Sequence, residues 1–244
     1  MSQHFMIGNG NLDKTARAMR ELSCVEAAIA ARLLRTPLPV GGDHVLNPDF
    51  SPAIDAAISA HAGLTPRSLK PKLRFKPAAV LIGLVPRPAG LMVLLTKRRD
   101  HLRTHAGQVA LPGGKIDAED ASAVAAALRE THEEVGIAPD CLRVLGQLGT
   151  YYSGSGFAVS PVIAHIDRDA KITANPDEVD YVFEVPLSFL MNEAHHIKGS
   201  RVFEGKERYF YTMPYEDHYI WGVTAGILRL FQQTVFVDAA CDTN

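Results

Sequence analysis

The stretch from Leu111 to Ile137, LPGGKIDAEDASAVAAALRETHEEVGI, constrains the fold more than any other part of the chain. Its second half carries Glu130, Glu133 and Glu134 in what reads as a helix, where residues three and four apart share a face. Carboxylates crowded in this way repel one another by about a few tenths of a kcal/mol per pair. A hard divalent cation that takes oxygen ligands, Mg²⁺ or Mn²⁺, would offset this repulsion. The alternative is a solvated acidic helix face, which is what most charge runs are.

The residues around these glutamates predict where the helix begins and ends. Asp120 or Ser122 can cap its first turn, and Gly136 can take the left-handed conformation that terminates it. Before the helix, Pro112-Gly113-Gly114 predicts a loop whose backbone can approach a ligand closely. A buried stripe is predicted on the side of the helix away from the carboxylates, made by Val124, Leu128, Thr131 and Val135.

The composition argues against several classes of partner. The formal net charge is −2 over 244 residues, which gives no positive field for nucleic acid or an anionic membrane. No apolar run approaches the ~18 residues of a membrane span, and the N-terminus lacks the pattern of a secretory signal. Three scattered cysteines give neither metal-ligand spacing nor a disulfide framework. We therefore expect a cytoplasmic protein.

The chain is predicted to divide into an N-terminal helical extension (1–71), a main domain (72–236) and a C-terminal tail (237–244). The extension should hold one helix from Asn11 to Leu34 and a second from Pro52 to Ala62. It carries no recognisable chemistry. We expect it to cover the core or to form the surface of a homodimer.

The main domain reads as strands on both sides of the glutamate helix. Two apolar runs, 78–85 and 91–98, are joined by a Pro/Gly turn and predict a hairpin. The first run is apolar on both faces, so it should be a central strand. Such an order predicts the α/β (α+β) class, an α/β/α sandwich with a mixed β-sheet. The other expected elements are strands at 142–150, 157–166 and 181–185, a strand pair within 200–211 and a closing helix at 223–231.

A basic run immediately precedes the Gly-Gly segment. A polyphosphate substrate needs cationic donors beside a metal, and arginine can grip phosphate oxygens in a fork. The alternative is a solvated turn with scattered basic residues, and at least one or two members of the run are of that kind. The potential cations are Lys97, Arg98, Arg99, Arg103 and His105.

The glutamate helix resembles the Nudix box, the signature of the Nudix hydrolases. Residues 129–137, RETHEEVGI, match its second half, Arg-Glu-U-x-Glu-Glu-x-Gly-U with U aliphatic, except that Thr131 replaces an aliphatic residue. In the first half, Gly114 and Asp120 fit only if one extra residue is admitted before Arg129. We therefore leave Asp120 outside the ligand set. The resemblance implies the Nudix fold and a metal site made by Glu130, Glu133 and Glu134.

The basic run is similar to an additional motif of the coenzyme A pyrophosphatase subfamily. The matching segments are 94–98, 102–103, 105–109 and 111–114, with Leu111 where the subfamily usually has phenylalanine. This similarity implies hydrolysis of coenzyme A, or of an acyl or oxidised derivative, to 3′,5′-ADP and 4′-phosphopantetheine or its derivative. The residues that would contact this substrate are Arg98, Arg99, Arg103, His105, Gly113 and Gly114.

The same resemblance implies that Arg129 orients one of the carboxylates while a water, deprotonated by a glutamate or activated by the ion, attacks phosphorus in line. Two candidates for the general base stay open: Glu134, and Glu178 in the polar turn at 175–180. Competing functions are hydrolysis of another nucleoside diphosphate derivative, such as ADP-ribose or NADH, and nucleotide sensing by a Nudix-fold module without turnover. All three helix carboxylates are present, which favours catalysis over sensing.

Overall fold

The computed structural model describes residues 9–34, 38–50, 75–102, 104–203 and 205–237, with side chains of the first helix described from Arg20 onward. Several predicted features lie outside these ranges. They are the helix at 52–62, the boundary between extension and main domain, Arg103, and residues 238–244 of the tail.

A nine-stranded mixed sheet forms the centre of the molecule, with six strands in the order β1-β7-β8-β2-β3-β4. β2 (Lys76–Arg87) pairs in parallel with β8 (Phe157–Ile166) and antiparallel with β3 (Gly90–Arg98). β2 is buried on both faces over most of its length. The predictions of a β2–β3 hairpin and of a central first strand are therefore confirmed.

Three further strands pair with this six-stranded order, and one of them, β5, lies beside the glutamate helix. β5 pairs with β2, β6 with β8 and β9 with β3, all antiparallel. The Pro-Gly-Gly segment was expected as a loop, but its glycines belong to β5 because their backbones pair with β2. The bounds are β1 (Gly41–Gly42), β4 (Val109–Ala110), β5 (Gly113–Lys115), β6 (Leu142–Gln147), β7 (Tyr151–Tyr152) and β9 (Val179–Pro186).

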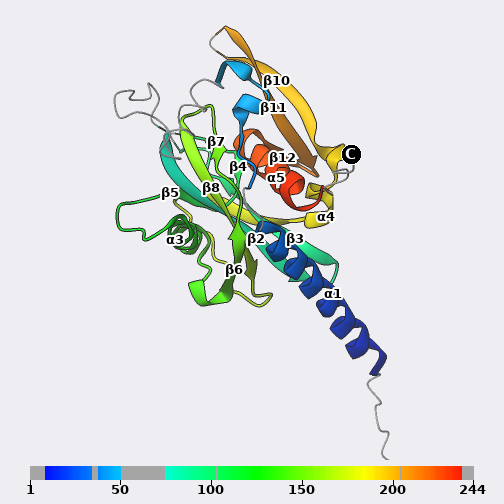
Figure 1. Cartoon of the computed structure of the whole chain (residues 1–244). Coiled ribbons are helices and arrows are strands. Elements are labelled where there is room, and N and C mark those ends of the chain that lie inside the picture. Colours follow the sequence, from blue (N-terminus) through cyan, green and yellow to red (C-terminus); the bar gives the residue numbers. More distant parts are fainter. Residues whose placement is uncertain (1–8, 35–37, 51–74, 103, 204, 238–244) are drawn as a thin grey trace, which may run out of the picture.

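Helices cover both faces of this sheet (Figure 1). α3 (Ala123–Val135) packs on one face, where Leu81 and Val162 are fully buried beneath it. On the other face α1 (Asn9–Leu33), α4 (Leu187–Leu190) and α5 (Gly222–Val235) enclose a larger core that includes Phe231. The predicted α/β/α sandwich with a mixed sheet is confirmed.

A separate three-stranded antiparallel sheet packs beside α5 (Figure 1). It buries Met213 and Ile220 in the larger core. It contains the strand pair expected within 200–211, and a third strand leads directly into α5. Its strands are β10 (Ile197–Phe203), β11 (Lys206–Tyr215) and β12 (His218–Trp221). Short 3₁₀ turns among the described residues are η1 (Asp43–Val45), η2 (Pro48–Phe50), η3 (Pro139–Cys141) and η4 (Glu193–His195).

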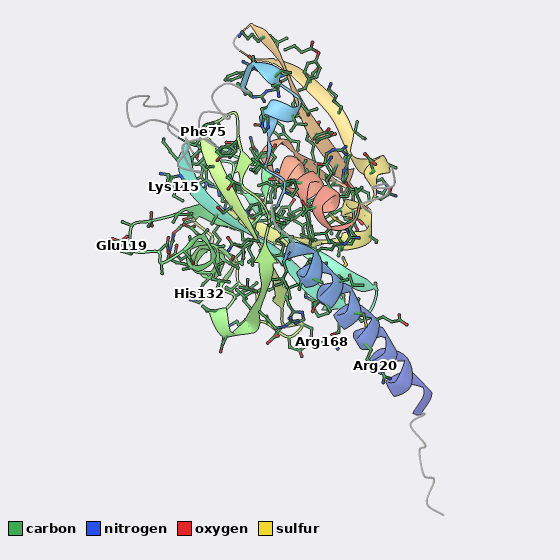
Figure 2. All side chains as sticks on the ribbon, in the orientation of Figure 1. Arg20, Phe75, Lys115, Glu119, His132 and Arg168 are labelled. Atoms are coloured by element: carbon green, nitrogen blue, oxygen red, sulfur yellow. The ribbon has the colours of Figure 1, made fainter. Side chains whose placement is uncertain are left out.

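The C-terminal half of α1 packs against the sheet, whereas its N-terminal end extends away from the rest of the molecule (Figures 1 and 2). Ile29 and Leu33 are buried in the larger core. Beside them the buried carboxylate of Glu26 accepts a hydrogen bond from Arg143 Nη2 at 2.7 Å and contacts His165 Nδ1 at 2.6 Å. This part of α1 therefore covers the core. Among the described residues, no helix is long and apolar enough to cross a membrane.

Candidate active site

The limits of α3 follow from its capping residues. The Ser122 hydroxyl accepts a hydrogen bond from the backbone N–H of Ala125 at 3.1 Å, so Ser122 is the N-cap. Gly136 has φ 68° and its N–H donates to His132 O, which ends the helix in the predicted left-handed conformation. The Thr131 hydroxyl donates to Ala127 O at 2.7 Å. This bond satisfies the hydroxyl inside the core, where the Nudix pattern has an aliphatic side chain.

The three helix carboxylates lie in three different environments. The side chain of Glu133 is 54% exposed, that of Glu130 17% and that of Glu134 only 5%. The prediction that the buried stripe lies away from the carboxylates was therefore wrong for Glu134, which is buried next to Thr131 and Val135. The reason is that β5 passes beside this face of the helix and covers it.

Glu134 is held in place by two donors at the buried edge of the cluster. Gly113 N–H donates to its Oε2 at 3.1 Å, and Arg98 Nη1 lies 3.4 Å from its Oε1. Burial raises the pKa of Glu134 to about 7, although the Gly113 N–H and the charge of Arg98 oppose the rise. A carboxylate with such a pKa is poised to exchange a proton near neutral pH.

Arg129 organises the exposed edge of the cluster. Its Nη1 donates to Glu130 Oε1 at 2.9 Å and to Glu133 Oε2 at 3.0 Å. Its Nε and Nη2 donate to the two oxygens of Asp120 at 3.0 and 2.9 Å, which is a bidentate pair. This bond to Arg129 holds the pKa of the Asp120 carboxyl below its usual value, with help from the Asp117 N–H.

Asp120 thus supports the cluster through Arg129, a role that its spacing in the sequence did not reveal. It contacts Arg129 and so fixes the guanidinium that contacts Glu130 and Glu133. Its Oδ2 also accepts from the backbone N–H of Asp117, which closes the turn before α3. The only signal in the sequence was an acidic residue nine positions before Arg129. Because Asp120 lies before α3, helix periodicity does not predict that it contacts Arg129.

The two glycines of β5 allow the strand to lie directly against α3. A Cβ atom added to Gly114 would come within 2.5 Å of the carboxyl carbon of Glu130. Gly113 has φ 152°, and a Cβ there would collide with the backbone of β2. Only glycine therefore permits this close approach of β5 to the carboxylates.

Glu178 brings a fourth carboxylate to the cluster from the turn before β9. Its negative charge raises the pKa of Glu130 and of Glu134, after the larger effect of burial on both groups. The turn is attached to the end of α3, because Asn175 N–H donates to Glu134 O at 2.8 Å. Residues more than forty positions apart are therefore brought together by the fold.

The side chains of the basic run contact different parts of the protein. Arg98 faces Glu134, and its Nε is buried with no hydrogen-bond partner among the described residues. Arg99 contacts the turn that carries Glu178, His105 contacts Gln108 at 3.0 Å, and Lys97 donates to Gly107 O. The predicted roles of Arg98, Arg99 and His105 in substrate binding stay predictions.

The donor set fits a hard divalent cation. Glu130, Glu133 and Glu134 share one side of α3 and one of them is buried, and Glu130 and Glu134 both feel the negative charge of neighbouring carboxylates, including Glu178. Across the described residues, no three acidic, histidine or cysteine side chains converge as a ready metal site. Arg129 Nη1 takes one oxygen of Glu130 and one of Glu133, so the second oxygen of each carboxylate stays available to an ion.

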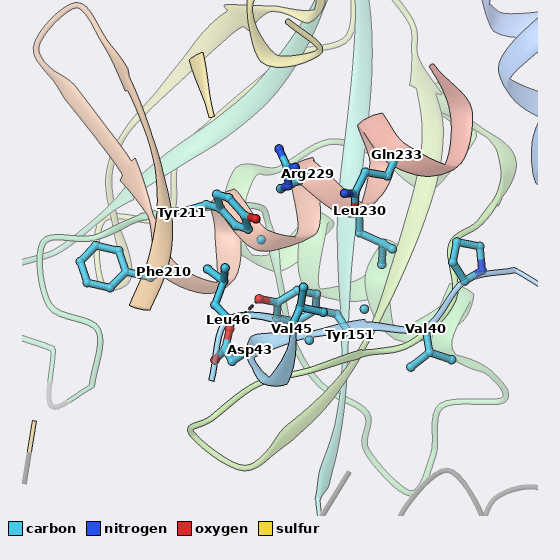
Figure 3. A pocket seen from close by; sticks show the side chains of 15 residues that line it. Val40, Asp43, Val45, Leu46, Tyr151, Phe210, Tyr211, Arg229, Leu230 and Gln233 are labelled. Carbon is cyan, nitrogen blue, oxygen red and sulfur yellow. Dashed lines mark hydrogen bonds between the residues drawn. The ribbon is translucent and has the colours of Figure 1, made fainter. Parts of the chain in front are cut away.

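A separate pocket of about 110 Å³ lies on the other face of the main sheet (Figure 3). It is lined by Tyr211 and Arg229 on one side and by Tyr151 on the other. The Tyr151 hydroxyl donates to Asp43 Oδ1 at 2.5 Å. None of the four carboxylates lines this pocket, so it is not part of the candidate active site.

Comparison with known proteins identifies the class to which this fold and cluster belong. The NUDIX domain family matches residues 75–205, more than half of the chain and the whole of the carboxylate cluster. The chain belongs to the Nudix family and is a hydrolase. Hydrolases of this family generally need divalent metal ions, in agreement with the donor set described above.

Two curated relatives are Nudix hydrolases of bacteria. The chain is 43% identical over 177 residues to "Uncharacterized Nudix hydrolase NudL" of Escherichia coli, covering 72% of this chain and 91% of that protein. NudL of an Enterobacter species is 42% identical over 179 residues, with the same coverage. Among solved structures, a MutT protein from Methanosarcina mazei is 18% identical with a TM-score of 0.42, covering 67% of this chain and 94% of that one.

Proposed function

We propose that this Nudix hydrolase cleaves the pyrophosphate bond of coenzyme A, or of an acyl or oxidised derivative, to 3′,5′-ADP and 4′-phosphopantetheine or its derivative. The observation that carries the hydrolytic part is the grouping of Glu130, Glu133 and Glu134 on one side of α3, with Gly113 of β5 bonded to Glu134. The choice of coenzyme A rests on the similarity of the basic run at 94–114 to the subfamily motif.

Hydrolysis of a phosphoanhydride requires charge neutralisation, a positioned substrate and a base. Mg²⁺ or Mn²⁺ bound by Glu130, Glu133 and Glu134 would neutralise phosphate oxygens as a Lewis acid. Arg129 and Asp120 hold the outer carboxylates in place. The glycines of β5 bring the strand backbone directly against the cluster.

Glu134 and Glu178 are the two candidates for the general base, and they differ in setting. Burial raises the pKa of Glu134 to about 7, but Gly113 N–H and Arg98 hold its carboxylate in a fixed position. That geometry suits a ligand held in one orientation. Glu178 lies in a turn, and its side chain is exposed to solvent. We therefore assign the base to Glu178 and ligation to Glu134.

The decisive test is product analysis by mass spectrometry after incubation of the full chain with coenzyme A, Mg²⁺ and ¹⁸O-labelled water. We expect 3′,5′-ADP and 4′-phosphopantetheine, with the label in one product only, because a single phosphorus is attacked. Cleavage of any bond other than the pyrophosphate would refute the proposed reaction.

The competing substrates are ADP-ribose and NADH, since other nucleoside diphosphate derivatives present the same diphosphate to the same cluster. Supplying coenzyme A and ADP-ribose together at equal concentration compares their kcat/KM values directly. A clear preference for ADP-ribose would exclude the assignment to coenzyme A but would leave the carboxylate site intact.

A further inference from the structure

Arg99 is bonded to the turn that carries Glu178 at three points. Its backbone N–H donates to Glu178 O at 3.0 Å, and its Nε donates to Pro176 O at 2.9 Å. Its Nη1 lies 3.4 Å from Asp180 Oδ1. The guanidinium therefore binds residues on both sides of Glu178, and its donors face the turn.

The pairing of β3 with β9 explains why this contact forms. Lys97 lies opposite Tyr181 and Arg98 lies opposite Val179, so Asp180 has no partner in the register. A bulge of this kind re-aims side chains at the end of a strand. Here it turns the Asp180 carboxylate toward Arg99, which immediately follows β3.

The other end of the same turn is attached to α3. Thr173 N–H donates to Val135 O and Asn175 N–H donates to Glu134 O, both at 2.8 Å. The turn is thus anchored to the glutamate helix at its start and to Arg99 at its end. Glu178 lies between the two anchors, and its negative charge acts on Glu130 and Glu134.

We propose that Arg99 is a positioning residue that holds the turn carrying Glu178 at the C-terminal end of α3 and so sets the affinity of the cluster for a divalent cation. The inference rests on the proposed role of this cluster in hydrolysis. It assigns to Arg99 a task within the protein, in place of the direct phosphate contact that the basic run suggested.

The guanidinium group suits this task and an ammonium group does not. Arginine presents donors in a fixed planar fork, which can reach Pro176 O and the Asp180 carboxylate at once. The Arg99 side chain is 38% exposed, so each contact is individually weak. The expected effect of its loss is therefore local loosening of the turn, with little change in global stability.

The test compares Arg99→Ala and Arg99→Lys with wild type, and with Arg168→Ala as a control for loss of an exposed arginine. In metal-free protein we expect the amides of Glu178 and Val179 to exchange hydrogen about tenfold faster in Arg99→Ala. Mn²⁺ binding without substrate, followed by electron paramagnetic resonance, should weaken about fivefold, with an intermediate loss in Arg99→Lys. Arg168→Ala should behave as wild type in both measurements.

Turnover then separates positioning from substrate binding. Positioning predicts a lower kcat for coenzyme A in Arg99→Ala, with KM within about twofold of wild type. In a Glu178→Gln background the Arg99→Ala change should cost little more, because both changes act through one group. Unchanged amide exchange, or faster exchange with unchanged Mn²⁺ affinity, would overturn the proposal. A raised KM with unchanged kcat would also overturn it, since Arg99 would then bind substrate.

Failure of the proposed function has a different signature. If coenzyme A is not cleaved, the exchange and Mn²⁺ measurements still decide whether Arg99 holds the turn and the site. If Glu178→Gln retains wild-type turnover, the general base is wrong, yet the same two measurements still report on the anchor.

Discussion

Replacing Glu134 with glutamine should make the metal-free protein more stable and the enzyme inactive. The carboxylate is buried, and its pKa rises from 4.5 to about 7 on folding, chiefly because of burial. A carboxyl whose pKa is raised in the folded state contributes stability below pH 4.5 that is lost as the pH rises through 7. At pH 8 this linkage amounts to roughly 3 kcal/mol of destabilisation by the ionised group.

The glutamine variant avoids this cost but keeps part of the local bonding. Its amide oxygen can still accept from Gly113 N–H, whereas its attraction to Arg98 is lost. We therefore expect Glu134→Gln to be about 1–3 kcal/mol more stable than wild type at pH 8 in the presence of a chelator, and close to wild type at pH 4.5. Its kcat should fall at least about a hundredfold, because an interaction needed in the transition state is removed.

The measurement is urea unfolding followed by fluorescence of the single tryptophan, Trp221, at both pH values. Added Mg²⁺ or Mn²⁺ should stabilise wild type and not the variant, because only the folded wild type binds the ion tightly. Glu133→Gln is the matched control: its carboxylate is exposed, so its stability should change by less than about 0.5 kcal/mol. A Glu134→Gln protein that is less stable than wild type at pH 8 without metal would refute the reasoning.

Three further substitutions test the supports of the cluster. Asp120→Asn replaces one charged oxygen of the pair with Arg129 and should lower kcat about tenfold with little effect on KM, measured by steady-state kinetics. Gly114→Ala places a Cβ against the Glu130 carboxyl, so it should weaken Mn²⁺ binding measured by calorimetry. An unchanged Mn²⁺ affinity would show that β5 can move away from α3. Ser122→Ala removes the N-cap bond of α3 and should cost about 1 kcal/mol in urea unfolding without changing Mn²⁺ affinity.

The sequence by itself was sufficient for features that depend on near neighbours. A cap at Asp120 or Ser122, the end at Gly136 and the hairpin of β2 and β3 follow from spacings of a few residues, and the structure has the cap at Ser122, the end and the hairpin. The grouping of Glu130, Glu133 and Glu134 on α3 has the same origin, because helix periodicity alone brings them to one side.

The tertiary structure decided which of those carboxylates is buried and which partners they have. Glu134 is buried because β5 lies against α3, and that contact depends on strand pairing between β5 and β2. Asp120 contacts Arg129 through a turn outside the helix, so its spacing of nine residues carried no periodic signal.

Long-range pairs are the clearest case of information that local pattern lacks. Arg99 meets the turn at Pro176, 77 positions later in the chain, and Glu26 meets His165, 139 positions later. In the sequence Arg99 and Glu26 are ordinary charged residues, since charge and helical spacing do not specify a distant partner. Only the packing of strands and helices into one core chooses among the possible partners, and that choice brings the basic run and the fourth carboxylate to the glutamate helix.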